Sequence, residues 1–577
     1  MTRSSGEFLP EDRPVRGVSR REVAFLILAV VVALLVRLYF FRFHTGVEGD
    51  GVHYADLARK IVRGTLWDGF YAYRASLYQV MVAGTALLTS FELETAGRLV
   101  SAFWGSLLTI PVYFLGRALG SRTVGVIAVA LVIVHQTLIS YSAMLFTEPT
   151  YMFFLYTGLL LVWVLLARPN ALTALAAGVL IGVASLVRAE GVVYFVGVFT
   201  VLVAMAFFGR NTANSRLPVF SVLVFAVAFA ATAGSASYWM WSKTGETPFA
   251  SKSTVNLLIG EDVGEYDVQK ASQRLLSLSP DAATLAFSTE AANTSLVDYL
   301  ASHPLQLLAR AYRNLGLLDR QVLVSALRPS DLSGATLAFF ALVTLGLFGT
   351  PWRRHTFGIH LYLLLIVWIG IASYVLFFFH ARLLLPVLPV FIVWASQGMV
   401  NFSQWATISW RAWSSGESAE RHALPSADRR ALLLGLSLSL LMLFNNLRTA
   451  EYYVDPLTQA YKTTGLWLKA YLPPQQVLMA DNPFVPYYYD SGQYVVLPYA
   501  EWPATVDFAR KNQVQYILVT QATVTAADYP QADALFSGAF PPEIELAAEF
   551  PVGSAGVIRL FKLLPDTGNG ESHGQGQ

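Results

Sequence analysis

Cysteine is absent from the 577 residues of the chain, and this absence excludes disulfide bridges, thiolate nucleophiles and cysteine-ligated metals. Charged residues are also scarce, at 14%, and they nearly cancel to a formal net charge of +2. Without a basic field over the molecule, nucleic acid is not a predicted partner. The composition therefore points away from disulfide frameworks, cysteine enzymes and nucleic-acid-binding proteins.

Apolar residues make up 55% of the chain and are grouped into long runs. The first run, Val23–Phe41, is near the roughly 20 residues that a helix needs to cross a bilayer. It is apolar on every face, which is not expected of a surface helix in a soluble protein. Arg16, Arg20 and Arg21 precede it like the charged end of a signal peptide. Because no small-residue cleavage site follows, the run is predicted to be a retained first span.

A window of about 19 residues predicts about eleven spans, which makes the chain an all-α polytopic membrane protein. The spans lie near 23–41, 96–116, 123–140, 149–167, 171–187, 191–208, 217–238, 334–350, 357–379, 383–400 and 431–447. If residues 1–22 are a cytoplasmic tail, every short inner connection carries arginine, as the positive-inside rule requires. These arginines are Arg117, Arg122, Arg168, Arg210, Arg216, Arg353, Arg354, Arg411, Arg421, Arg429 and Arg430. An odd number of spans then places the C-terminus outside.

Two predicted outer loops, 42–95 and 239–333, are too long to be simple connections. Long loops in compact proteins usually carry function. Within the second loop, His303–Val324 has the periodicity of an amphipathic helix lying in the plane of the membrane interface. Its apolar face comprises Leu305, Leu308, Ala309, Tyr312, Leu315 and Leu318. The predicted transmembrane domain, 23–447, therefore includes a helix that lies on the membrane rather than across it.

After the last predicted span the composition becomes that of a soluble domain, residues 448–564. Short apolar stretches alternate there with amphipathic ones, which favours a small α/β layer. The expected strands are Val477–Met479, Tyr494–Leu497, Tyr516–Val519 and Val557–Leu563, and the expected helices are Leu457–Tyr471 and Ala504–Lys511. No glycine-rich phosphate-binding motif follows a strand, so nucleotide binding has no support. Residues 565–577, rich in glycine and glutamine, are predicted to be a disordered tail.

The first outer loop opens with two acids, Glu48 and Asp50, at the mouth of the first span. Asp50 suits the N-cap of the helix that follows, and on that interpretation Glu48 is only a solvated side chain. The alternative interpretation is a general base presented at the membrane surface. The two interpretations are compatible, because a capping aspartate keeps a second carboxylate oxygen.

Two further charged sites lie at predicted outer ends of spans. Glu148 abuts an apolar helix with Pro149 in its first turn, where an acid gains from the helix dipole without any other role. Arg188 and Glu190 join two spans with almost no linker, so both are expected at or near membrane depth. Charges there are costly and tend to be paired or functional. Mutual neutralisation of this pair is the simpler interpretation.

Arg382 lies at another predicted outer boundary, beside Pro386 and Pro389. A lone arginine at this depth often reaches out to lipid headgroups. The two prolines, however, interrupt the helical hydrogen bonds next to it and indicate a shaped pocket. The planar donor fork of arginine suits a phosphate group. The predicted outer face thus collects carboxylates and arginines from distant parts of the chain.

In this order, the elements resemble those of the polyprenyl-phosphate-sugar-dependent membrane glycosyltransferases, which include protein O-mannosyltransferases and the aminoarabinose transferase acting on lipid A. The segment Asp50–Ala58 resembles the first-loop motif of the family, with Gly51 where many members have a second acid. Arg74–Tyr78 resembles an Arg-Pro-Pro-Leu-Tyr element without its prolines. The family has three later elements, and they are similar to Tyr141–Pro149, to Gly182–Gly191 with Ala189 in place of proline, and to Arg382–Gly398.

This resemblance, of the glycosyltransferase family 39 type, covers about the first four hundred residues. It implies the multispan helical fold called GT-C and an inverting transfer of a sugar from polyprenyl phosphate to an acceptor hydroxyl on the outer face. Asp50 would be the general base, Glu48 would substitute for the second acid, and Glu148 would orient an arginine or the sugar. The residues implied in binding the donor phosphate and sugar are Arg382, Arg188, Tyr54, Glu190 and Arg74.

The expected partners are a polyprenyl-phosphate-linked sugar, an acceptor that is a lipid, glycan or protein, and the bilayer. No cofactor is predicted: family members use metal variably, and Glu48-Gly49-Asp50 is too short a motif to indicate a metal site. A lipid-linked sugar flippase or other transporter is the alternative function, although transporters generally place charges near the bilayer midplane. The expected location is the cell membrane, with a cytoplasmic N-terminus and an extracytoplasmic C-terminal domain.

Overall fold

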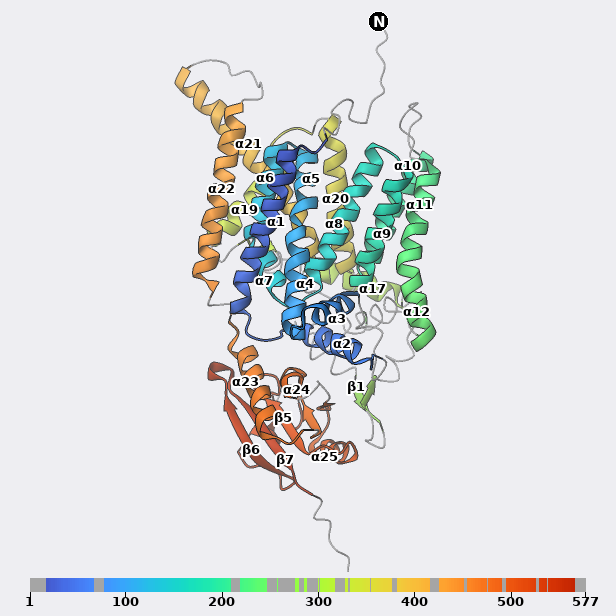
Figure 1. Ribbon diagram of the computed structural model, residues 1–577, viewed down its shortest axis with the longest axis vertical. Coiled ribbons are helices and arrows are strands. Elements are labelled where there is room, and N and C mark those ends of the chain that lie inside the picture. The colour runs from blue at the N-terminus through green and yellow to red at the C-terminus, as the bar shows by residue number, and fades with distance from the viewer. Residues whose placement is uncertain are drawn as a thin grey trace, which may run out of the picture. The chain divides into compact units, whose positions relative to one another are not determined.

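The computed structural model contains two compact units (Figure 1). The first comprises Met1–His44, His53–Gly260 and Ser295–Tyr453, and the second comprises Thr45–Val52, Glu261–Thr294 and Val454–Gln577. The structure describes residues 17–66, 77–208, 218–245, 257, 276–279, 285–287, 299, 301–316, 327–329, 333–352, 354–375, 381–415, 425–450, 454–474, 476–489, 494–525, 529–536 and 538–565. The predicted tail 565–577 therefore lies outside the described residues, apart from its first position.

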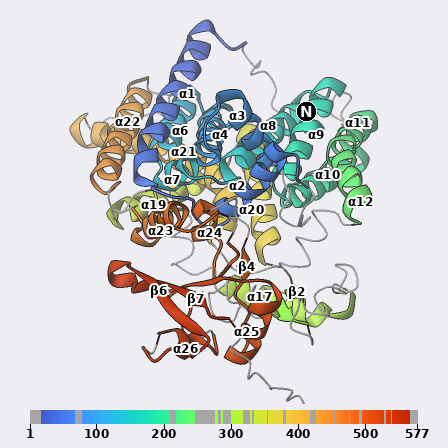
Figure 2. The same ribbon diagram turned by 60° about the horizontal axis from the view of Figure 1, so that its bottom comes forward.

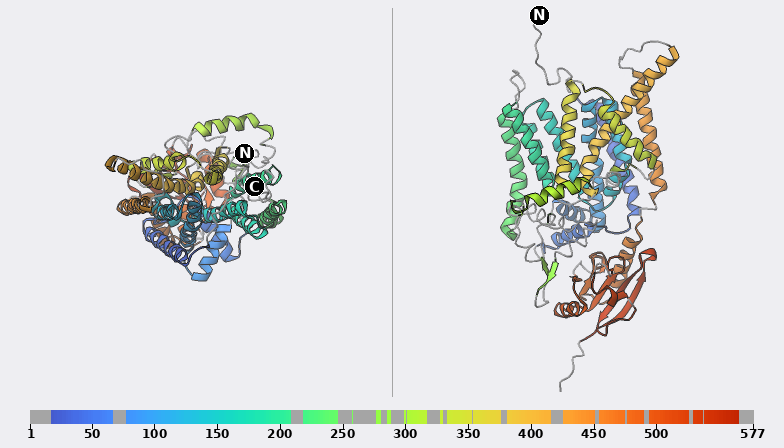
Figure 3. Two further views of the ribbon diagram at one scale, coloured as in Figure 1. Left: turned by 90° about the horizontal axis from the view of Figure 1, so that it is seen from above. Right: turned by 180° about the vertical axis from the view of Figure 1, so that it is seen from behind.

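The first unit is built from long apolar helices that run side by side (Figures 1 and 3). Those that match predicted spans are α1 (Arg20–Phe40), α4 (Leu93–Leu107), α5 (Thr109–Leu119), α6 (Arg122–Val134), α7 (Gln136–Ala143), α8 (Glu148–Ala167), α9 (Ala171–Val187), α10 (Gly191–Phe208), α11 (Val219–Phe229), α12 (Ser235–Thr244), α19 (Ser333–Phe348), α20 (Arg354–Val375), α21 (Leu388–Ser415) and α22 (Pro425–Arg448). A π-helical turn, η3 (Ala230–Gly234), joins α11 to α12. Each predicted span falls on one helix or on two consecutive helices.

Helix length and apolarity qualify six segments of the described chain to cross a membrane, or seven when the bent pair α6 and α7 counts as one span. The remaining predicted spans coincide with the shorter apolar helices α9, α10, α19 and α20. The mostly helical, multispan class agrees with the sequence. The predicted count of about eleven exceeds what helix length alone supports, and the orientation of the termini stays a prediction.

α1 begins where the sequence provides a capping box. The Ser19 hydroxyl accepts from the amide of Glu22, and the Glu22 carboxylate accepts from the amide of Ser19. The same carboxylate pairs with Arg117 near the end of α5 at 3.0 Å and with Arg122 at the start of α6 at 3.1 Å. These residues all come from segments predicted to face inward, so α1, α5 and α6 are tied together at that end.

α19 and α21 pack backbone against backbone at two glycines. A Cβ added to Gly346 would lie 1.8 Å from the carbonyl oxygen of Trp394. A Cβ added to Gly398 would lie 1.9 Å from the carbonyl oxygen of Leu342. No side chain fits at either position. Close approach through small residues is characteristic of helices that associate within a membrane, where burial of apolar side chains gives little driving force.

Three further described helices match no predicted span: α2 (Gly51–Arg63), which belongs to the first unit from His53 on, α3 (Leu77–Thr89) and α17 (Pro304–Gly316). α17 lies across the direction of the long helices, in lime at the right of Figure 3. It is the described part of the predicted amphipathic helix, and Leu318 lies outside the described residues. Its apolar residues Leu305, Leu308, Tyr312 and Leu315 are all exposed.

Two polar residues of α17 point the other way. Arg310 is buried and donates to the carbonyl of Leu257 at 2.8 Å and to the hydroxyl of Tyr299 at 2.8 Å. Asn314 is buried and donates to the carbonyl of Val375 at 2.9 Å. The helix therefore turns Arg310 and Asn314 toward the protein and most of its apolar side chains outward, which is the arrangement that an apolar environment favours.

The second unit contains a five-stranded sheet of order β4-β3-β5-β7-β6. The strands are β3 (Leu478–Ala480), β4 (Val495–Val496), β5 (Tyr516–Thr520), β6 (Ile544–Pro551) and β7 (Val557–Leu563). β3 pairs in parallel with β4 and β5, whereas β7 runs antiparallel to β5 and β6. Figure 2 shows β6 and β7 side by side. The helices are α23 (Pro456–Tyr471), α24 (Phe484–Tyr489), α25 (Trp502–Lys511) and α26 (Ala532–Phe536). β1 (Leu276–Leu278) and β2 (Leu285–Phe287) form a separate antiparallel pair.

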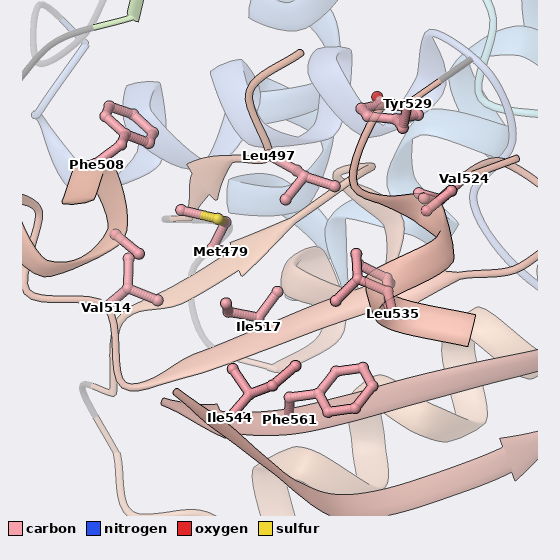
Figure 4. Packing of buried hydrophobic residues seen from close by; sticks show 13 residues of the cluster. Met479, Leu497, Phe508, Val514, Ile517, Val524, Tyr529, Leu535, Ile544 and Phe561 are labelled. Atoms are coloured by element: carbon pink, nitrogen blue, oxygen red, sulfur yellow. The ribbon is translucent and has the colours of Figure 1, made fainter. Parts of the chain in front are cut away.

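Successive strand residues point to opposite sides of the sheet. Helices pack against both sides. One face carries Met479, Ile517 and Phe561 from three adjacent strands, packed with Phe508 of α25 and Leu535 of α26 (Figure 4). The other face carries Leu478, Leu518 and Leu560, packed with Tyr461 and Leu468 of α23. The small α/β layer expected from the sequence is thus present.

β6 was not predicted. It is an edge strand whose residues after Ile544 are mostly exposed or partly exposed. Its sequence contains Glu545, Glu549 and two consecutive alanines, which are weak strand formers. The hydrogen bonds to β7 hold these residues in a strand although their own strand propensity is low.

Candidate functional site

Glu148 opens α8 and is almost fully buried, with 1% of its surface exposed. It follows the N-cap residue Thr147, and Pro149 occupies the first turn, as expected from the sequence. At this position the amino end of the helix favours negative charge. A buried carboxylate still needs hydrogen bonds and opposite charge to offset its lost hydration, so the partners of Glu148 define the site.

Arg188 supplies the first partner. It caps the C-terminus of α9, donating its backbone amide to the carbonyl of Ala184 at 2.9 Å. Its Nη1 donates to the Glu148 carboxylate and to the Thr147 hydroxyl, the latter at 3.1 Å. Its Nη2 donates to Glu190 at 2.7 Å. The predicted neutralisation of Arg188 by Glu190 therefore occurs, but Arg188 joins Glu148 to the same pair.

Arg382 supplies the second partner from a distant part of the chain. It lies in η4 (Ala381–Val387), the 3₁₀ turn that contains Pro386 and leads into α21. Its Nε donates to the same Glu148 oxygen that accepts from Arg188. Its guanidinium also lies 4.5 Å from the ring centroid of Phe146, a stabilising cation–π arrangement. The turn is held in place because the Tyr156 hydroxyl donates to the Pro386 carbonyl.

Tyr54 of α2 borders the cluster. Its side chain is buried, and its ring meets the ring of Tyr78 edge-on at 5.7 Å. Tyr78 in turn bonds to the carbonyl of Gly97 at 2.9 Å and lies 2.8 Å from the hydroxyl of Ser101. Tyr54 also interacts electrostatically with Arg188. Arg74, the other residue predicted in this region, lies outside the described residues.

Two tyrosines that the sequence analysis did not single out adjoin the charged residues. Tyr151 lies one turn beyond Glu148 in α8, and Tyr194 lies one turn beyond Glu190 in α10. Both are buried, and within the described part of the chain their hydroxyls have no hydrogen-bond partner. The Tyr151 hydroxyl interacts electrostatically with Glu190 and Arg188. A tyrosine one helical turn from an acid is the signal that would have found them.

Glu48 and Asp50 lie in a turn of the second unit. The amide of Gly51 donates to the carbonyl of Glu48 at 2.9 Å, and Gly49 has a φ of 48°, which suits a residue without a Cβ. Asp50 is exposed and directly precedes α2. Its predicted helix-capping bond stays a prediction. Since α2 continues from Gly51 to Tyr54, Asp50 stands one helical turn before that tyrosine.

Among the described ranges, no three histidine, aspartate or glutamate side chains gather where they could hold a metal ion. Around Glu148, two carboxylates and two guanidiniums gather: Glu148 accepts from Arg188 and Arg382, and Glu190 accepts from Arg188. Such a set is prepared for an anion rather than a cation, because guanidiniums are the groups that chelate phosphate oxygens.

The cluster of Glu148, Arg188, Glu190 and Arg382 can stabilise negative charge without reorganising. One carboxylate oxygen fixes both arginines, and Phe146 and Thr147 limit their remaining freedom. Donors that are oriented before a reaction begins contribute most to a transition state that gathers charge. The arrangement therefore suits the departure of an anionic leaving group at this end of the helices.

Part of the chain matches a known family. Residues 27–233 match the model of the dolichyl-phosphate-mannose-protein mannosyltransferase family. The matched region includes Asp50, Glu148 and Arg188 and ends before Arg382. No curated protein sequence matches the chain.

The fold is shared with solved structures. ArnT from Cupriavidus metallidurans in the apo state is similar over 94% of this chain and 98% of that chain, with a TM-score of 0.55 and 12% identity. ArnT from the same organism bound to undecaprenyl phosphate is similar over 93% and 98%, with a TM-score of 0.51 and 12% identity. The Archaeoglobus fulgidus oligosaccharyltransferase tethered with an acceptor peptide containing the NVT sequon is similar over 88% and 72%, with a TM-score of 0.50 and 13% identity. At these identities the likeness establishes a common fold.

Proposed function

We propose that this chain, a membrane protein with the GT-C glycosyltransferase fold, moves a sugar from a polyprenyl-phosphate donor to an acceptor hydroxyl on the outer face of the membrane. The family match and the fold confirm the resemblance inferred from the motifs. The donor, the chemistry and the side of the membrane are inferred from the site. The observation that carries the proposal is the Glu148 carboxylate holding the Arg188 and Arg382 guanidiniums together.

The two guanidiniums have the chemistry that a phosphate leaving group requires. In the transfer, the bond between the anomeric carbon and the phosphate oxygen breaks, and its electron pair remains on the phosphate. Arg382 and Arg188 would offset the charge that gathers there, an effect worth several kcal/mol when water is excluded. Glu148 would act on the arginines rather than on the sugar, because its shared oxygen already accepts from both of them.

Asp50 is the proposed general base. The acceptor oxygen would form a bond to the anomeric carbon from the face opposite the phosphate, which inverts the configuration, while its proton passes to Asp50. The proposal is supported by the exposure of Asp50 and by its place directly before α2. Glu48, two residues earlier in the same turn, is the proposed second acid. Tyr54, buried one helical turn after Asp50 in α2, is the proposed donor contact.

The related structures support the choice of substrates. ArnT was solved with undecaprenyl phosphate, which is a polyprenyl phosphate without sugar. The Archaeoglobus fulgidus oligosaccharyltransferase was solved with an acceptor peptide. For this chain we infer a polyprenyl-phosphate sugar as donor and a lipid, glycan or protein as acceptor. The sugar is a hexose or a pentose, and the location is the cell membrane with an extracytoplasmic C-terminal domain.

The proposal is tested with the purified protein and synthetic undecaprenyl-phosphate hexoses and pentoses. Each donor is combined with a Ser/Thr-containing peptide, lipid A or a polysaccharide acceptor, and released undecaprenyl phosphate and glycosylated acceptor are measured by mass spectrometry. We expect transfer from one donor class, with inverted anomeric configuration in the product. Accumulation of the same lipid-linked sugar in a deletion strain would support it. The proposal would be contradicted if the purified protein transferred no sugar from any donor while the deletion strain failed to move the lipid-linked sugar across the membrane. That result would favour the flippase alternative.

A further inference from the structure

The turn that carries Asp50 is attached to the C-terminal α/β domain. The segment Thr45–Val52, which contains this turn, groups with that domain in the second unit. The backbone amide of Val47 donates to the hydroxyl of Tyr488 at 2.8 Å, although the two residues are 441 positions apart. The Val47 side chain is also buried, with 2% of its surface exposed. The segment is therefore held by both its backbone and its side chain.

The neighbouring residue, Gly46, shows how closely the segment approaches the domain. A Cβ added there would lie 2.7 Å from Cγ2 of Thr458 and 3.2 Å from the Thr458 carbonyl oxygen. It would also lie 3.3 Å from the hydroxyl oxygen of Tyr488. The chain thus passes between α23, which contains Thr458, and α24, which contains Tyr488. A larger residue at this position would force the segment away from both helices.

The hydroxyl of Tyr488 is itself well positioned. α23 approaches α24 closely at Gly465, where an added Cβ would lie 2.5 Å from Cβ of Tyr488. The ammonium of Lys462, also on α23, lies 5.4 Å from the Tyr488 ring centroid, within the range of a cation–π contact. The tyrosine that binds Val47 therefore packs closely against α23.

Asp50 follows Val47 by three residues, and this short connection has few free torsions. The Glu48 carbonyl accepts from the Gly51 amide at 2.9 Å, so the intervening residues form a closed turn. One end of the turn is held at Val47, and the other end continues into α2. The start of the turn, three residues before Asp50, is consequently tied to Tyr488 through the Val47 amide.

We propose that Tyr488 is a positioning residue for Asp50, and that the C-terminal domain takes part in the transfer reaction by fixing the catalytic turn through the Val47 amide. This inference rests on the proposed function, in which Asp50 is the general base. Tyr488 itself does not contact the reacting atoms. Its effect must therefore appear in the rate of the chemical step rather than in donor binding, which the inference leaves to the arginines of the first unit.

The principal test is Tyr488→Phe, assayed with the undecaprenyl-phosphate sugar that the wild-type protein uses. The variant keeps the ring and loses the hydroxyl, so kcat should fall about tenfold, as expected for one lost hydrogen bond. KM for the donor should stay within about twofold, because the interaction acts on the chemical step. The matched control is Tyr489→Phe, which removes a hydroxyl that donates to the Pro473 carbonyl at 2.6 Å inside the same domain. That control should lower thermal stability and leave kcat unchanged.

A second test asks whether the effect passes through Asp50. In an Asp50→Asn background, Tyr488→Phe should cause no further loss, because the group that it positions has been removed. A purely structural role would instead lower the residual activity by the same factor in both backgrounds. Equal factors in the two backgrounds would therefore overturn the inference.

A third test uses the contact at Gly46. Gly46→Ala should reduce kcat at least as much as Tyr488→Phe, since the added Cβ displaces the segment. Thr458→Ser removes the methyl group that the Cβ meets and keeps the hydroxyl that donates to Asp455 at 2.6 Å. It should restore part of the lost kcat in the double variant and have little effect alone. Full activity of Gly46→Ala would count against a held segment.

The outcomes separate this inference from the function on which it rests. Absence of transfer by the wild-type protein, or full transfer by Asp50→Asn, contradicts the proposed function or its general base. An inactive Asp50→Asn together with a fully active Tyr488→Phe overturns the positioning role alone. A Tyr488→Phe variant that raises KM and leaves kcat intact has the same consequence, because it assigns the hydroxyl to donor binding.

Discussion

The Nε of Arg382 donates to the carboxylate of Glu148, a residue that precedes it by 234 positions. The carboxylate is buried at the start of α8, and the arginine lies in the 3₁₀ turn before α21. The contact brings two of the motif elements into one site. It also gives Arg382 a fixed orientation before any substrate binds, which a guanidinium pointing toward lipid headgroups would not have.

The first prediction concerns the phosphate site. Arg382→Lys should lower kcat/KM by about tenfold or more although it keeps the charge, because an ammonium lacks the planar fork. Arg382→Ala should be worse, and both variants should bind undecaprenyl phosphate more weakly in a titration. Arg313→Lys, at an exposed position of α17, is the matched control and should behave as wild type. Normal turnover by Arg382→Ala at normal expression would exclude Arg382 from the mechanism.

A second prediction concerns Glu148. Glu148→Gln replaces the shared carboxylate by a neutral amide. The guanidiniums of Arg188 and Arg382 thereby lose the negative charge that they share. We expect the free energy of unfolding to fall by about 3 kcal/mol and donor affinity to fall as well. Glu94→Gln is the control, because it neutralises the acid of another largely buried pair, Glu94–Arg98 at 2.8 Å in α4. That variant should lose stability and keep its donor affinity. Equal donor affinity in the two variants would show that Glu148 has a structural role only.

The third prediction distinguishes catalysis from helix capping at Asp50. Asparagine is also a good N-cap, so Asp50→Asn should fold and insert normally. It removes the proton acceptor, and loss of a general base typically lowers the rate by about 10²- to 10⁴-fold. Glu48→Gln should be milder. Wild-type transfer by purified Asp50→Asn would reduce Asp50 to a cap and direct the search for the base to Glu48 or Glu148.

A fourth prediction is topological. The arginine distribution places the residues after α22 on the outer side, together with the loop 239–333. A reporter fused after Asn446 should therefore be active only in the outer compartment, and one fused in the inner connection near Arg168 only in the cytoplasm. The opposite pattern would move the cluster around Glu148 to the inner face and remove the basis for transfer outside.

The fifth prediction concerns Asp481 in the C-terminal domain, after β3. Burial raises the pKa of Asp481 from 3.8 to about 6, although hydrogen bonds from Thr523 and Asn482 oppose the shift. Between these two values the folded protein keeps a proton that the unfolded chain has lost, so stability falls as pH rises through this window. The full effect is on the order of 3 kcal/mol above pH 6.

Asp481→Asn, neutral at every pH, should therefore match the wild-type domain near pH 4 and exceed its stability at pH 8. Hydrogen exchange of the β5 amides, compared between the two proteins at each pH, measures the difference without a correction for intrinsic exchange rates. A constant difference across this pH range would mean that the carboxyl group does not titrate in the folded domain as stated.

The sequence predicted the helical spans and the main strands because both follow from local periodicity. It also predicted that Arg188 and Glu190 lie in one short connection between two spans, and almost no chain separates α9 from α10. It could not predict that Arg188 and Arg382 share one oxygen of Glu148, because that contact depends on the packing of helices far apart in the chain. Each residue alone had an ordinary explanation as a cap, an ion pair or a lipid anchor.

The same limit applies to the turn around Asp50. Its composition predicted a loop or a cap, and the sequence assigned it to the outer surface of the transmembrane domain. Its contact with Tyr488 joins positions 441 residues apart and involves a backbone amide, which has no signature in the sequence. Tyr151 and Tyr194 were overlooked for a related reason: a tyrosine in an apolar helix resembles any other core aromatic until its neighbours are known.

The glycine contact between α19 and α21 bears on how this protein can diversify. At Gly346 and Gly398 even a methyl group would overlap a carbonyl oxygen of the opposite helix. In a saturation library, alanine at either position should therefore be depleted as strongly as leucine, whereas core positions lined by side chains should accept alanine better than charge. These two sites can accept a side chain only if the backbones separate. Contact between the two backbones therefore constrains the sequence at these two positions of the α19–α21 interface.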